Sequence, residues 1–174
     1  MFLSINNKLN ITLCGMMGSG KTAVGKIMAK KINYKFIDID RLIEIKAKKS
    51  ISNIFEEDGE KYFRNLEQKI TIDILKSKKT IVSLGGGAII NKSIRNSIKK
   101  NSYNIYLKVS IDILKKRLEN SRQRPLIIKK DLNQTLSELI KKREKFYKLA
   151  DLVIINESNI ISTVENIITK LRND

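Results

Sequence analysis

The sequence is poor in cysteine, in proline and in long apolar runs. Its single cysteine, Cys14, cannot form an intrachain disulfide, and the initial segment MFLSINNKLN lacks the basic-then-apolar layout of a signal peptide. These absences favour a cytoplasmic protein in which Cys14 is a small buried side chain. No apolar run approaches the roughly 20 residues that a membrane-spanning helix requires. The chain is therefore expected to be soluble, without a membrane partner.

Internal repeats and Gly/Ser linkers are also missing. A chain of 174 residues with 41% hydrophobic and 30% charged residues is typical of one globular domain. We expect a single domain over residues 1–174, and a monomer.

Negative charge is scarce, because 35 Lys and Arg outnumber 18 Asp and Glu and leave a formal net charge of +17. Such a charge attracts nucleic acids and small anions such as nucleotides. The lysines accompany abundant Ile and Asn in every segment and do not gather in one basic stripe. The charge is therefore interpreted as a compositional bias, and no nucleic-acid partner is expected.

Short β-rich runs alternate with longer segments whose apolar residues recur at helical spacing. Several of the short runs are apolar almost throughout, which is typical of parallel strands covered by helices on both faces. The last helical stripe, in residues 160–171, is expected to cover the sheet. The pattern predicts an α/β fold with a parallel sheet. The expected strands are residues 10–14, 34–39, 80–85, 104–109 and 152–156.

The segment GMMGSGKT, residues 15–22, matches the phosphate-binding loop pattern G-x-x-x-x-G-K-[ST]. It follows an expected strand and precedes a helical pattern, as that loop requires. Gly15, Gly18 and Gly20 allow a tight turn whose N–H groups point at phosphate oxygens. Lys21 is predicted to reach the β- and γ-phosphates, and the Thr22 hydroxyl to bind Mg²⁺.

The run FIDID ends the second expected strand with two carboxylates. Because side chains in an extended chain alternate with period two, Asp38 and Asp40 are expected on the same side, near the phosphates. One of them can serve Mg²⁺, while the other accepts a hydrogen bond from a substrate hydroxyl. The alternative is that Asp40 only caps the helix RLIEIKAKK.

Further motifs follow in an order and spacing that closely resemble the shikimate kinase family. They are KYFRNLE (61–67), SLGGGA (83–88), RQRPLI (122–127) and KKREKFY (141–147). With GMMGSGKT and DID, the resemblance covers about residues 10–156. It implies the P-loop fold of nucleoside-monophosphate kinases, with a five-stranded parallel sheet and a mobile lid. It also implies Mg²⁺-dependent transfer of the ATP γ-phosphoryl group to the 3-hydroxyl of shikimate.

The resemblance also implies a role for particular residues. Arg64, oriented by Glu67, and Arg143 would bind the shikimate carboxylate, which suits the planar guanidinium group. Without the family pattern, Arg64 is a surface residue paired with Glu60 or Glu67. Helices in about residues 40–77 would hold the acceptor. The implied substrate-binding residues are Asp40, Arg64, Gly85, Gly86, Gly87 and Arg143.

On the nucleotide side, the resemblance implies a lid at about residues 120–132 whose Arg124 meets the phosphates. Arg117 would lie near the base, whereas the segment NESN (156–159) lacks a basic residue that many members place near adenine. The implied catalytic residues are Lys21, Asp40 and Arg124, and Thr22 and Asp38 would bind the metal. The implied ATP-binding residues are Gly18, Ser19, Gly20, Lys21, Thr22, Ala23, Arg117 and Arg124.

Other functions fit parts of this pattern. A gluconate or adenylate kinase would share the phosphate-binding loop, but FR-x-x-E and GGG do not belong to that pattern. A nucleic-acid-binding P-loop protein would use the positive charge, but the lysines are dispersed and not interleaved with aromatic residues.

Overall fold

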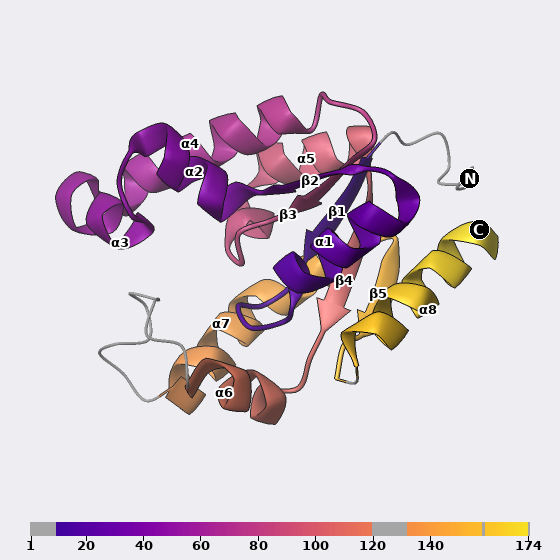
Figure 1. Ribbon diagram of the computed structural model, residues 1–174. Coiled ribbons are helices and arrows are strands. Elements are labelled where there is room, and N and C mark those ends of the chain that lie inside the picture. The colour runs from indigo at the N-terminus through magenta and orange to yellow at the C-terminus, as the bar shows by residue number, and fades with distance from the viewer. Residues whose placement is uncertain (1–9, 120–131, 158, 174) are drawn as a thin grey trace.

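The computed structural model describes residues 10–119, 132–157 and 159–173. It contains a parallel sheet of five strands in the order β2-β3-β1-β4-β5 (Figure 1). The α/β architecture predicted from the sequence is confirmed, and the strand bounds differ from the expected ones by at most two residues. The strands are β1 (Asn10–Cys14), β2 (Lys35–Asp38), β3 (Thr80–Ser83), β4 (Ser102–Lys108) and β5 (Leu152–Ile155).

Two apolar cores lie on opposite faces of the sheet, because successive strand side chains point to opposite faces. On one face α1 (Lys21–Ile32) and α8 (Ile160–Asn173) pack on strand residues such as Leu13. On the other face the helices pack on residues such as Val82. These helices are α4 (Gly59–Ile74), α5 (Lys92–Asn101), α6 (Ile111–Glu119) and α7 (Leu132–Tyr147).

The remaining helical segments connect these elements. After β2 the chain forms α2 (Ile39–Ala47), α3 (Ile51–Asn53) and the π-helical turn η1 (Ile54–Asp58), which lead into α4. A 3-10 turn, η2 (Ala88–Ile90), precedes α5. In Figure 1, α2, α3 and α4 extend from one end of the sheet.

The carboxyl ends of β1, β2 and β3 meet at one edge of the sheet, because the strands are parallel. The segments that follow these strands are the phosphate-binding loop, Asp38 with α2, and the glycines 85–87. Ligands of open parallel sheets bind at this edge. The topology therefore gathers the residues that the sequence motifs singled out.

The apolar stripe expected in residues 160–171 is only partly buried. Val164, Ile167 and Leu171 are buried under the sheet, whereas Ile160 and Ile161 are 36% and 53% exposed. Both exposed residues lie in the first turn of α8, where they line a surface cavity instead of the core. None of the helices in the described ranges is long and apolar enough to cross a bilayer.

Candidate active site

The phosphate-binding loop turns between β1 and α1 with positive backbone φ angles at Gly15, Gly18 and Gly20. Only glycine adopts these conformations without strain. The Lys21 side chain folds back over the loop, and its Nζ donates to the carbonyls of Gly15 at 3.0 Å and Met16 at 2.9 Å. These carbonyls hold the ammonium group without neutralising its charge. The loop therefore presents a fixed cation beside the N-terminus of α1.

Every described residue of the predicted ATP set lies in or next to this loop. Gly18, Gly20, Lys21, Thr22 and Ala23 line a cavity of about 730 Å³. Ser19 is fully buried, and its hydroxyl has no hydrogen-bond partner among the described residues. Arg124 and most of the predicted lid lie outside the described residues.

Asp38 and Asp40 both line the cavity next to the phosphate-binding loop. The alternation of side chains along a strand, from which the sequence predicted this, is not the cause. Strand β2 ends at Asp38, so Asp40 lies in the first turn of α2 and the period-two argument is wrong. The proposal that Asp40 caps the helix is also wrong, because Asp38 accepts the capping hydrogen bond from the Arg41 N–H at 3.3 Å. The other Asp38 oxygen accepts a hydrogen bond from the Thr22 hydroxyl at 2.6 Å.

The glycines 85–87 lie against charged side chains. A Cβ added at Gly85 would come within 2.5 Å of Glu67 Oε1 and 2.7 Å of Asp40 Oδ1. At Gly87 it would come within 2.9 Å of the Arg64 guanidinium, and at Gly86 within 3.4 Å of Arg143 Nη1. None of these glycines has a positive φ, so close approach, and not a special turn, requires glycine here.

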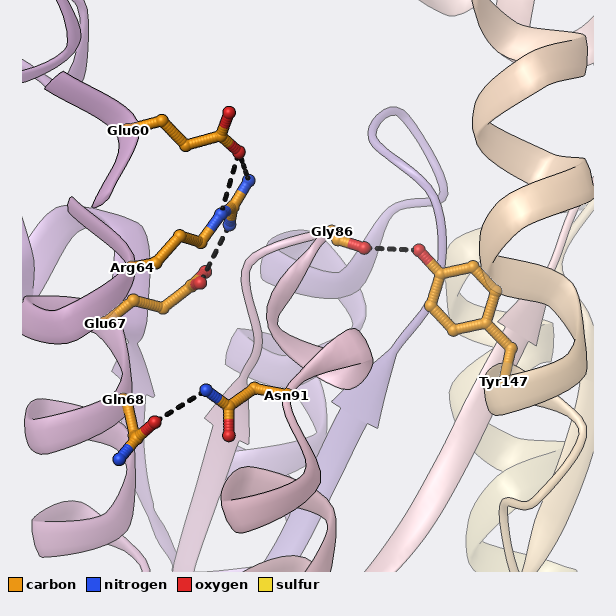
Figure 2. A network of polar contacts seen from close by, with 7 residues as sticks. All are labelled: Glu60, Arg64, Glu67, Gln68, Gly86, Asn91 and Tyr147. Carbon is orange, nitrogen blue, oxygen red and sulfur yellow. Dashed lines mark hydrogen bonds and ion pairs between the residues drawn. The ribbon is translucent and has the colours of Figure 1, made fainter. Parts of the chain in front are cut away.

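Arg64 on α4 is held by two carboxylates (Figure 2). Its Nη1 donates to Glu67 Oε2 at 2.8 Å, and both Nε and Nη2 donate to Glu60 Oε1 at 3.2 Å. Burial raises the pKa of Glu67, and the charge of Arg64 only partly offsets this effect. Burial alone would lower the pKa of Arg64, but Glu67 and Glu60 together raise it. The guanidinium is therefore charged and oriented, and the Arg64 side chain is 31% exposed.

Arg143 on α7 lies against the glycine loop, residues 85–87, on the side opposite to Arg64. It is 4% exposed, and its Nε has no hydrogen-bond partner within the described ranges. The same holds for Glu67 Oε1, which faces Gly85. Buried polar groups are nearly always paired, so these two atoms are available to a polar ligand. Asp40, Arg64 and Arg143 thus all lie against the glycines 85–87.

Arg117 lies on the far side of the phosphate-binding loop. Its guanidinium donates to the Gly18 carbonyl at 3.3 Å and to the Asn156 carbonyl at 3.0 Å. These residues line a second cavity of about 630 Å³ together with the start of α8. Asn156, which the sequence reasoning did not select, also donates through its side chain to the Ser19 carbonyl at 2.8 Å. The position of Arg117 next to the loop agrees with contact to a bound nucleotide.

Tyr147 is a second site residue that the sequence reasoning missed. Its hydroxyl donates to the Gly86 carbonyl at 2.5 Å (Figure 2), and its ring stacks on Tyr106 with centroids 5.0 Å apart. In the sequence, Tyr147 follows Arg143 by four residues, a spacing that places both on one face of a helix. That spacing was the signal available in KKREKFY.

A phosphate-binding loop at the carboxyl edge of a parallel sheet, beside a glycine loop that an acidic residue and two arginines contact, is typical of a P-loop kinase that acts on a small anionic acceptor. The family model "Shikimate kinase" matches residues 17–172 of the chain. The shikimate kinase of Sulfurihydrogenibium sp. is 43% identical over 164 residues, covering 94% of this chain and 98% of that protein. That of Chlorobaculum parvum is 40% identical over 170 residues, covering 92% and 91%.

The solved structures that resemble this chain include members of the same family. The shikimate kinase from Acinetobacter baumannii in complex with shikimate has a TM-score of 0.91 and 30% identity, covering 95% of this chain and 93% of that one. A gluconokinase from Sinorhizobium meliloti has a TM-score of 0.59 at 15% identity, which shows a shared fold alone. The chain belongs to the shikimate kinase family, so it is an ATP-dependent phosphotransferase of the shikimate pathway.

Proposed function

We propose that the chain transfers the γ-phosphoryl group of ATP in line to the 3-hydroxyl of shikimate, with Asp40, Arg64 and Arg143 holding the acceptor. The observation that carries this proposal is the convergence of these three side chains on the glycines 85–87, beside the phosphate-binding loop. Two guanidinium groups suit the carboxylate of the acceptor. Asp40 suits its hydroxyl, because a carboxylate accepts a hydrogen bond from the attacking group and orients it.

Positively charged side chains would stabilise the transition state of phosphoryl transfer. The transition state spreads negative charge over three phosphoryl oxygens, so fixed cations lower its energy more than that of the bound substrates. Lys21 is such a cation, and it is held within the loop by two carbonyls. The proposed role of Arg124 rests on the sequence resemblance, and so does the lid. In a loose transition state Asp40 orients the hydroxyl first and accepts its proton second.

Thr22 and Asp38 fit a magnesium site. Their oxygens lie 2.6 Å apart at the rim of the phosphate-binding loop, and hydroxyl and carboxylate oxygens are ligands that Mg²⁺ prefers. The described residues hold no group of three or more His, Cys, Asp or Glu side chains that could bind a metal by themselves. This agrees with a Mg²⁺ ion that keeps several waters and phosphate oxygens as ligands. When bound, the ion neutralises phosphate charge.

A coupled assay of ADP release tests the acceptor. We expect turnover with shikimate and none above background with gluconate or AMP, because neither offers a carboxylate and a ring hydroxyl in the required arrangement. Turnover with gluconate or AMP at a comparable rate would contradict the proposal, since the fold would then serve a different acceptor. Omitting Mg²⁺ from the same assay should remove turnover.

Glu60 offers a second test, because it occupies the Nε and Nη2 edge of Arg64 that a substrate carboxylate would use. Glu60 is 65% exposed, and exposed ion pairs are weak. We expect Glu60→Gln to tighten shikimate binding about two- to fivefold by removing a competing carboxylate. Calorimetry measures this change. Asp73→Asn, an exposed charge change on the same helix, is the control and should bind as the wild type does. Weaker binding by Glu60→Gln would show that Glu60 orients Arg64 instead of competing.

A further inference from the structure

Tyr147 joins the helix that carries Arg143 to the glycine loop. Its side chain is 1% exposed, and its hydroxyl donates to the Gly86 carbonyl at 2.5 Å. The same hydroxyl lies 3.7 Å from the Met16 sulfur in the phosphate-binding loop. Tyr147 therefore contacts both loops that flank the proposed acceptor, without lining the cavity beside them.

The hydrogen bond fixes the direction of one peptide group. The bond between Gly86 and Gly87 is trans, so its carbonyl and its N–H point in opposite directions. The carbonyl points to α7, as Figure 2 shows, and Arg64 lies on the other side of the loop. The Gly87 N–H is consequently directed toward Arg64, the side on which the acceptor is proposed to bind.

The Gly86 carbonyl is held by the Tyr147 side chain, whereas the carbonyls of Gly85 and Gly87 are held by backbone N–H groups. The Gly85 carbonyl accepts from the Ala88 N–H and the Gly87 carbonyl from the Ile90 N–H, both at 3.1 Å. A peptide between two glycines meets little steric resistance to rotation, because neither residue has a Cβ. Without the Tyr147 hydroxyl, the partly buried Gly86 carbonyl would lose this hydrogen bond, and rotation of the peptide would relieve that cost.

Tyr147 is itself held rigidly. Its ring stacks on Tyr106 of β4 at an interplanar angle of 19°. Burial raises the pKa of Tyr147 well above its ordinary value, so the hydroxyl keeps its proton and remains a donor at any physiological pH. A fixed donor on a packed ring can impose its direction on a flexible glycine loop.

We propose that Tyr147 is a positioning residue for the acceptor: its hydroxyl fixes the Gly86–Gly87 peptide so that the Gly87 N–H donates to an oxygen of bound shikimate. The inference rests on the proposed function, since it requires the acceptor to lie between Arg64 and Arg143. One turn of α7 would then supply both a cation for the carboxylate and the orientation of a neutral donor.

The test is Tyr147→Phe, which keeps the ring stack and removes only the hydroxyl. We expect shikimate binding, measured by calorimetry, to weaken about three- to tenfold, the usual effect of losing one hydrogen bond. ATP affinity, measured without acceptor, should stay within about twofold, because the phosphate loop is held by its own backbone and by Lys21. Tyr106→Phe, which removes the hydroxyl of the stacking partner and leaves the Gly86 contact, is the matched control.

A spectroscopic measurement separates this role from a general loss of structure. The chain contains 8 glycines, so labelling with ¹⁵N-glycine gives a short and assignable set of amide signals. Shikimate should shift the Gly87 signal strongly in the wild type and weakly in Tyr147→Phe. Unchanged shikimate affinity in Tyr147→Phe, or an equal loss for ATP and shikimate, would overturn the inference. If Arg143→Ala also left shikimate affinity unchanged, the proposed acceptor site itself would be wrong.

Discussion

Lys21→Met should reduce phosphoryl transfer by about 100- to 1,000-fold or more, the usual effect of removing one fixed group that stabilises transition-state charge. The Lys21 ammonium is 8% exposed and held by the carbonyls of Gly15 and Met16, so its charge lies within the loop that receives the phosphates. Methionine has a similar length and no charge, and it leaves the packing of α1 intact. Steady-state kinetics with shikimate and ATP measure the loss, and thermal unfolding checks the fold.

Lys30→Met is the matched control for this variant. It makes the same change at an exposed position on the same helix, so it should keep wild-type turnover. Near-native turnover of Lys21→Met would show that the phosphate-binding loop has no catalytic role. A loss of activity that merely follows a loss of folded protein would contradict the account as well, because the ammonium is assigned to the phosphates and not to stability.

Arg64→Ala and Arg143→Ala should each weaken shikimate binding about tenfold or more. Each removes a charge-assisted contact to the carboxylate worth roughly 1.5 to 3 kcal/mol. The two arginines lie on α4 and α7, far apart in the sequence, and meet at the glycine loop. Calorimetry with shikimate measures the loss. ATP affinity without acceptor should change little, because neither arginine is assigned to the phosphates.

Lys142→Ala serves as the control for charge. It removes one positive charge from an exposed position next to Arg143 on the same helix, so shikimate binding should stay near the wild-type value. An equal effect of Lys142→Ala would show that long-range attraction by the positive surface, and not a specific contact, governs binding.

Patterns with a local physical cause were predicted well from the sequence. The strand, glycine loop and helix around Lys21 follow from backbone requirements within a few residues of one another, and the structure confirms them. The parallel orientation of the strands follows from their apolar runs and from the helices between them. Glu67 was correctly expected to orient Arg64, because residues three apart lie on one face of a helix.

Features that depend on contacts between distant segments were predicted less well. Strand β2 gives way to α2 one residue earlier than its pattern indicated, since the Asp38 side chain caps the helix and ends the strand. The role proposed for Tyr147 depends on its hydrogen bond to Gly86, which lies 61 residues away in the sequence. No local sequence pattern indicates that contact. The space that Gly87 leaves for Arg64 likewise appears only when α4 packs beside the loop.

Arg64 and Arg143 are proposed to recognise the carboxylate of the acceptor together. The most direct measurement compares shikimate with an analogue whose carboxylate is replaced by a neutral group, titrated into the wild type and both alanine variants. The account predicts that the wild type binds the analogue poorly, and that neither substitution weakens that binding much further, as a double-mutant cycle between enzyme and ligand requires. If Arg64→Ala and Arg143→Ala weakened ATP binding and left shikimate affinity unchanged, the account of the acceptor site would be contradicted.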